Sequence, residues 1–134
     1  MSVRLIPPQT PLTEPYWQGA LEGKLKIQAC QDCGARQFPP SAHCQKCGSG
    51  FLVWEDVSGR GSVYTYTVAE RPPHPIFVDH CPMVIAVVEL EEGPRMMTNV
   101  IGCDPTEVTI GMAVVVDFDP IDDSETVLPV FRPA

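Results

Sequence analysis

Four cysteines constrain this 134-residue chain more than any other feature. They form two Cys-x-x-Cys pairs, Cys30 with Cys33 and Cys44 with Cys47, and a glycine follows each pair. Each pair can form a tight turn whose two sulfurs point to one centre, and glycine tolerates the left-handed backbone of such a turn. Four thiolates that converge tetrahedrally suit zinc, with Zn–S distances of about 2.3 Å. The sequence therefore predicts a zinc site ligated by these four cysteines.

We expect this site to be structural, because four cysteines close the coordination shell, whereas catalytic zinc sites usually keep one position for water. Iron bound by the same sulfurs, or an empty and partly oxidised site, are the alternatives. His43 precedes Cys44 and could compete as a ligand, but neighbours in sequence rarely aim at one ion. A dithiol redox role is weaker, because one pair would suffice and no strand–helix–strand pattern surrounds it.

Charge and hydropathy bound the surroundings of the site. The N-terminus lacks a signal-peptide core, and no stretch approaches the ~20 apolar residues that span a bilayer. We therefore expect a cytoplasmic protein with no membrane partner, where reducing conditions favour metal binding over disulfides. Residues 57–134 hold four basic and twelve acidic residues, so they account for the whole net charge of −8. Such a surface repels phosphate backbones, and we expect no nucleic-acid partner.

The pattern of apolar residues predicts a mainly β chain with one N-terminal helix. Thr13 can cap this helix, Pro15 fits its first turn, and Gly23 would end it. A half-buried strand over 24–30 alternates Leu25, Ile27 and Ala29 with Lys24, Lys26 and Gln28. Another strand is expected over 51–59, after the cysteines.

From Gly61 onward the chain alternates with a period of two or is wholly apolar, and it is rich in Val, Ile, Tyr and Thr. Five strands are expected, over 62–70, 83–92, 95–102, 112–121 and 127–133. Five short strands in so few residues predict a small closed barrel of the oligonucleotide/oligosaccharide-binding (OB) type, with an open sandwich as the second choice. The predicted organisation is arm, helix and first strand over 1–29, zinc ribbon over 30–56, and barrel over 57–134.

In this order the parts resemble a family of acyl-CoA-associated proteins, long labelled a domain of unknown function. These proteins join a rubredoxin-like zinc ribbon to an OB-fold domain. The resemblance covers about residues 11–133, and its most specific parts are "YWQGALEGKLKIQACQDCGARQFPPSAHCQKCGS", "GRGSVYTYTV" and "IGMAVVVDF". Members act as small subunits of thiolase-like enzymes and of aldolases, and the large partner carries the nucleophile and the acid/base residues.

The resemblance implies a non-catalytic accessory subunit of a thiolase or retro-aldolase in lipid or aromatic degradation. This subunit would stabilise a thiolase-like large subunit in a heterotetramer and shape its site for a coenzyme A (CoA) thioester. The sequence itself shows no nucleophile elbow, phosphate loop or HExxH motif, and we expect no catalytic residue. Two alternatives stay open: a free-standing acyl-CoA-binding protein, and a nucleic-acid-binding module, which the acidic barrel disfavours.

Six residues are predicted to contact a partner or acyl-CoA: Trp17, Lys24, Lys26, Arg36, Ile76 and Phe77. Trp is common at interface hot spots, but Trp17 could equally form an apolar pad for the ribbon. The three cations, together with Lys46, could pair with the phosphates of CoA or simply face water. The last two residues lie in the Pro-rich loop 70–82 and could dock into a partner or cap the barrel.

Three further features invite a functional interpretation that we do not favour. Asp79, His80 and Cys81 suggest a triad, but triad members usually come from distant segments, so we expect a loop or partly buried thiol. Cys103 ends an apolar strand and is expected to pack as a small hydrophobe. Residues 117–123 look calcium-like but lack the Gly and final Glu of an EF-hand, which indicates a solvated acidic turn.

Overall fold

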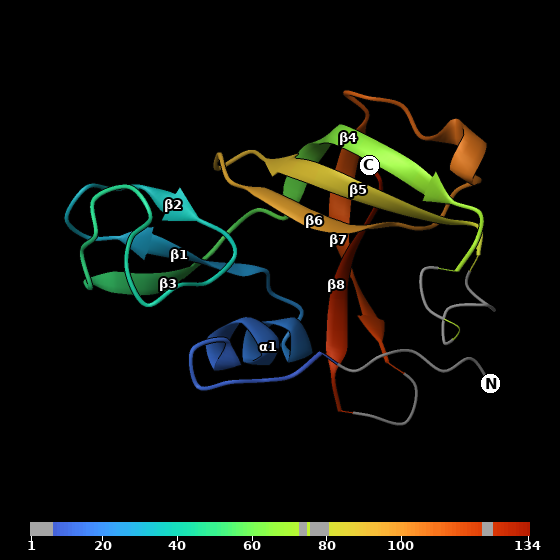
Figure 1. Cartoon of the computed structure of the whole chain (residues 1–134). Helices are drawn as coiled ribbons and strands as arrows, with labels where there is room; N and C mark the ends of the chain where they lie inside the picture. The colour runs from blue at the N-terminus through green and yellow to red at the C-terminus, as the bar shows by residue number, and fades with distance from the viewer. Residues whose placement is uncertain (1–6, 73–74, 76–80, 122–124) are drawn as a thin grey trace.

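The structure is a computed structural model that describes residues 7–72, 75, 81–121 and 125–134. Figure 1 shows a small three-stranded sheet beside a barrel, with one helix beneath them. The predicted fold, with its N-terminal helix, zinc ribbon and five-stranded OB barrel, is confirmed. Among the described residues no helix is long and apolar enough to cross a membrane.

The helix α1 (Glu14–Leu21) begins and ends close to the predicted residues. Pro15 lies in its first turn, and Gly23 follows its end with a φ of 75°. Thr13 occupies the N-cap, but its hydroxyl accepts the Thr10 N–H at 3.0 Å and caps no helical N–H. Tyr16 and Trp17 form the buried face, with their rings edge to face at a centroid distance of 4.9 Å.

The ribbon sheet has the order β2-β1-β3 and is antiparallel. Its strands are β1 (Lys26–Cys30), β2 (Arg36–Gln37) and β3 (Leu52–Asp56). β2 is not predicted, because a strand of two residues is too short to show any periodicity. Gln28 is only 3% exposed, so β1 is buried on both faces and the expected polar face is wrong at this position.

The barrel closes in the order β4-β5-β6-β8-β7, which excludes the open sandwich. Its strands are β4 (Arg60–Ala69), β5 (Met83–Leu90), β6 (Arg95–Val100), β7 (Ala113–Pro120) and β8 (Val127–Pro133), with a short 3-10 helix, η2 (Pro105–Glu107), between β6 and β7. All pairs are antiparallel except β6 with β8. Alternate residues of β5 point inward, and Val84, Ala86 and Val88 are each at most 3% exposed.

The ribbon and the barrel share one continuous core. Tyr16, Trp17 and Ile27 belong to the same buried cluster as Val88 and Phe131 of the barrel, and α1 contacts β8. The segment between β3 and β4 forms hydrogen bonds with both the ribbon side and the barrel. The Val57 N–H donates to the Leu25 carbonyl at 2.9 Å, and the Ser58 N–H donates to Glu92 Oε2 at 3.0 Å. The position of the ribbon is therefore fixed by packing and by hydrogen bonds.

Candidate metal centre

Two turns with the same backbone pattern present the four cysteines. In the first, the Gly34 N–H donates to the Cys30 carbonyl at 3.0 Å, and the Cys30 N–H donates to the Ala35 carbonyl at 2.8 Å. In the second, the corresponding bonds from Gly48 to Cys44 and from Cys44 to Ser49 measure 2.8 and 2.7 Å. Both glycines have positive φ, 76° and 80°, which a residue with a Cβ rarely adopts. The glycine after each pair therefore serves the turn.

The four cysteine sulfurs are grouped around one centre. All four Sγ atoms lie within 4.8 Å of one another. The Cys30–Cys47 and Cys33–Cys44 pairs are each 3.6 Å apart. A tetrahedron with Zn–S arms of about 2.3 Å has edges of about 3.8 Å, close to these separations. The arrangement therefore fits a structural zinc ion, and within the described part of the chain His43 does not belong to the ligand group.

Backbone N–H groups lower the pKa of two of these thiols, Cys30 and Cys44. The N–H groups of Cys47 and Lys46 point at the Sγ of Cys44, at 3.5 and 3.4 Å, and lower its pKa to about 6. For Cys47, the backbone N–H of Ser49 lowers the pKa, but burial and the neighbouring thiols outweigh it and raise the pKa to about 12. Bound zinc would supply the positive charge that allows all four sulfurs to be thiolates together.

A buried pair of glutamines orders the loop between the two cysteine pairs. Gln28 donates to the Ser41 carbonyl through Nε2 and accepts the Ser41 N–H through Oε1, both at 2.9 Å. Gln37 donates to Gln28 Oε1 at 2.8 Å and accepts the Gln45 N–H at 2.8 Å. Neither glutamine is predicted from the sequence as part of the site. Their only signal is a polar side chain in each strand beside the cysteines, and surface strands show the same pattern.

The remaining cysteines do not form a nucleophilic site among the described residues. Cys81 is partly exposed, and its two neighbours in the suspected triad, Asp79 and His80, lie outside the described residues. Cys103 packs against the core, as predicted. Burial, followed by the charges of Glu107 and Asp104, raises the pKa of the Cys103 thiol and so favours its unreactive protonated form.

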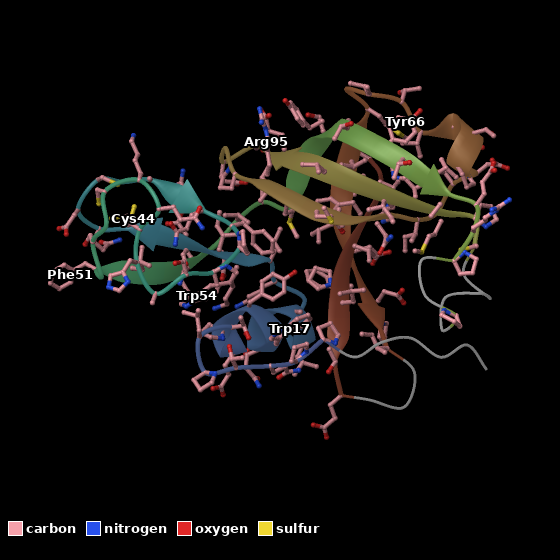
Figure 2. All side chains as sticks on the ribbon, viewed as in Figure 1. Trp17, Cys44, Phe51, Trp54, Tyr66 and Arg95 are labelled. Atoms are coloured by element: carbon pink, nitrogen blue, oxygen red, sulfur yellow. The ribbon has the colours of Figure 1, made fainter. Side chains whose placement is uncertain are left out.

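The predicted contact residues fall into three groups. Trp17 is only 8% exposed and lies in the shared core, so the structure favours packing for it (Figure 2). Lys24 and Lys26 pair with Asp56 at 4.0 and 3.4 Å, and Arg36 pairs with Glu55. Ile76 and Phe77 lie outside the described residues. Contact of any of these six residues with a partner or with acyl-CoA stays a prediction.

Two family models match consecutive parts of the chain. The model described as "ChsH2, rubredoxin-like zinc ribbon domain" matches residues 17–52. The model described as "ChsH2, C-terminal OB-fold domain" matches residues 54–119. The two matches meet within strand β3, the last strand of the ribbon sheet.

Three curated relatives have informative names. A probable enoyl-CoA hydratase alpha subunit of Thermomonospora curvata is 45% identical over 89% of this chain and 36% of its own length. The 3-oxo-4,17-pregnadiene-20-carboxyl-CoA hydratase alpha subunit of Mycobacterium tuberculosis is 38% identical over 74% of this chain and 31% of its own length. A DUF35 domain-containing scaffold protein of Pyrococcus furiosus is 33% identical over 74% of this chain and 72% of its own length. The chain thus spans only about a third of either hydratase subunit.

Two solved structures share the fold. A chain of a structure described as "Ltp2-ChsH2(DUF35) aldolase" is 41% identical and superposes with a TM-score of 0.84, covering 96% of this chain and 98% of that one. A DUF35-family protein of unknown function from Sulfolobus solfataricus is 14% identical, with a TM-score of 0.64 over 94% of this chain and 87% of that one. The second likeness shows the fold alone.

Proposed function

This chain belongs to the ChsH2 family of DUF35 proteins, and from that premise we propose that it is a non-catalytic accessory subunit of an enzyme acting on acyl-CoA thioesters. Two relatives are called alpha subunits of CoA hydratases. One solved relative belongs to a structure whose description joins two protein names, Ltp2 and ChsH2, in one aldolase. These names support a place in a larger enzyme. The match to 98% of the aldolase chain supports the retro-aldolase form of the proposal.

One structural observation carries the accessory role: the outer face of the barrel along β5 is apolar. Val84, Ala86 and Val88 fill the interior, so the alternate residues Met83, Ile85 and Val87 point outward and are half-buried. Met97 of β6 lies opposite Val87 in the register and is 72% exposed. The exposed face of an antiparallel sheet is normally polar. An apolar outer strip of this kind marks an interaction surface.

We name Met83, Ile85, Val87 and Met97 the outer strip and propose that the large subunit covers it. The proposed partner is a thiolase-like chain, in a complex of two small and two large subunits. In this arrangement the large subunit supplies the groups that stabilise the enolate or oxyanion of the thioester. The present chain contributes contact, and its zinc holds the ribbon in shape.

A second candidate is a free-standing acyl-binding protein, favoured by a cavity of about 490 Å³ near one end of the barrel. Apolar residues such as Val84, Val100 and Val130 dominate its lining. Most small-molecule sites are concave and apolar with a few polar groups. Calorimetry of the purified chain with a series of acyl-CoA thioesters separates the candidates. Affinity that rises with acyl length would support the second.

The accessory role is tested by purifying the tagged chain with its zinc from its native host. The expected result is a stoichiometric complex with a larger chain, and acyl-CoA turnover that belongs to the complex. The proposal fails if the chain purifies alone and no large subunit of a CoA-dependent enzyme binds it when the two are co-expressed.

A further inference from the structure

A second cleft, of about 340 Å³, lies between the zinc ribbon and the barrel. Three separate segments line it: β2 with its neighbours, the second cysteine turn, and the start of β6 with the proline before it. Each contributes one cation, namely Arg36, Lys46 and Arg95. In Figure 2 the labelled Arg95 lies at the end of the β5–β6 hairpin that is nearer to the ribbon.

This gathering of cations is unusual in a chain with nine basic and seventeen acidic residues. The lining of the cleft includes three of the nine and no carboxylate. Lys24 and Lys26 do not line it, because they pair with Asp56 on β3. Of the four cations that are grouped in the sequence, only Arg36 and Lys46 line the cleft, and Arg95 from the barrel joins them.

Two of the three cations are held in place by the protein itself. Arg36 pairs through Nε with Glu55, and Arg95 pairs through Nε with Glu89 at 3.1 Å. The Arg95 guanidinium also lies over the Tyr64 ring, 3.7 Å from its centroid. Guanidinium carries five donors in a rigid fork, so bonds through Nε leave the terminal donors for another acceptor. Preorganised side chains of this kind lose little entropy when a ligand binds.

Lys46 is the third cation, and within the described part of the chain it forms no ion pair. It is exposed and lies in the cysteine turn, where its own N–H points at the Cys44 sulfur. The backbone of Lys46 is thus fixed by the turn, while its ammonium is free to meet an anion.

We propose that this cleft binds the phosphate groups of a CoA thioester, with Arg36, Lys46 and Arg95 as the anion-binding residues. The inference rests on the proposed function, which supplies a CoA thioester as the ligand of the complex. Arginine forks and a lysine ammonium are the usual protein partners of phosphate. Phe38 adds an aromatic side to the lining. The ribbon then holds the polar end of the ligand, and the reacting thioester lies in the large subunit.

The test uses the zinc-loaded full chain and two-dimensional amide NMR, which detects millimolar binding. Free CoA is titrated beside pantetheine, which has the same arm without phosphates, and beside hexaglutamate, an acidic peptide. We expect CoA to shift the amide signals of the three cleft residues, pantetheine to leave them unchanged, and added salt to weaken the CoA effect.

Matched variants locate the site. The double variant Lys46→Gln/Arg95→Gln should weaken CoA binding about tenfold, since each exposed charge pair contributes up to ~1 kcal/mol. Arg132→Gln removes one charge from the barrel outside the cleft, where Arg132 pairs with Asp117 at 3.8 Å, and should leave the affinity within about twofold. An unchanged thermal midpoint confirms that each variant is folded.

The proposal is overturned if CoA leaves the cleft signals in place, or if Arg132→Gln weakens binding as much as the double variant. It is also overturned if hexaglutamate binds more tightly than CoA, which would assign the cleft to an acidic protein segment. None of these outcomes affects formation of the complex with a large subunit, so the accessory role is judged separately.

Discussion

The side chain of Gln37 donates a hydrogen bond to the side-chain oxygen of Gln28 at 2.8 Å, and both residues are buried in the ribbon. Gln28 Oε1 accepts the Ser41 N–H as well, so one amide oxygen joins two strands and the loop between the cysteine pairs. The zinc-binding turns thus depend on a polar cluster as well as on their sulfurs.

Gln28→Ala should loosen the zinc site although Gln28 is not a ligand. The change removes the acceptor of the Ser41 N–H, at about 1–3 kcal/mol, and leaves Gln37 Nε2 with only its weaker bond to the His43 carbonyl at 3.3 Å. We expect faster zinc release to a chelator and a lower unfolding midpoint. Gln31→Ala is the matched control, because the Gln31 side chain is exposed and, among the described residues, only its backbone forms a hydrogen bond. Equal zinc release from the two variants would contradict the role given to Gln28.

Removal of the metal should unfold the ribbon and leave much of the barrel intact. The ribbon has a short three-stranded sheet, whereas the barrel closes on its own five strands. Binding energy at structural zinc sites is folding energy. Metal analysis should give one zinc per chain. In amide NMR spectra, the signals of residues 26–56 should lose their dispersion when a chelator is added or in the Cys44→Ser variant. The signals of β5 and β6 should keep their folded positions. Iron in place of zinc, or a ribbon unchanged without metal, would refute this.

Gly59→Ala should strongly destabilise the junction between ribbon and barrel. Gly59 has a φ of 76°, and an added Cβ would lie 2.3 Å from Val116 Cγ1. A positive φ costs about 1–2 kcal/mol for residues other than glycine, and overpacking adds about 1–3 kcal/mol. Gly111→Ala is the control, since Gly111 has a φ of 87° but nothing within 4 Å of the added atom. Urea unfolding should show the larger loss for Gly59→Ala, and equal losses would remove the packing argument.

Met97→Glu should weaken assembly with the large subunit without unfolding the chain. Met97 is 72% exposed, so a carboxylate there meets water in the free chain but would be buried in the complex. Phe51→Glu is the control: Phe51 is 71% exposed and lies on the ribbon, far from the outer strip (Figure 2). Affinity for the large subunit, measured by biosensor, should fall at least tenfold for Met97→Glu alone. Unchanged affinity would show that the outer strip is not the interface.

Much of this fold could be predicted because its signals are local. The four cysteines with Gly34 and Gly48 define two turns by spacing alone. Alternating apolar residues and many β-branched residues predict the strands of the barrel, and the turn at Gly93–Pro94 separates β5 from β6. These features need no knowledge of distant contacts, which explains the agreement in order and number of the barrel strands.

The rest depends on contacts between segments that are distant in sequence. Gln28 looks like a surface residue until Gln37 and Ser41 fold against it. The cleft between ribbon and barrel brings Arg95 of the barrel near Arg36 and Lys46 of the ribbon. No spacing in the sequence indicates that these three residues line one cleft. The apolar outer face of β5 is visible as a run without polar residues, but a run of this kind also fits a strand buried on both faces.

A turnover assay on the purified, zinc-loaded chain tests whether this chain works by contact and leaves bond-making to its partner. Thioester cleavage or hydration is followed with and without the large subunit, using acyl-CoA substrates that the complex accepts. We expect no turnover above background from the chain alone and full activity once the large subunit is added. Turnover by the isolated chain at a rate near 1 s⁻¹ or above, the ordinary range of enzymes, would contradict it.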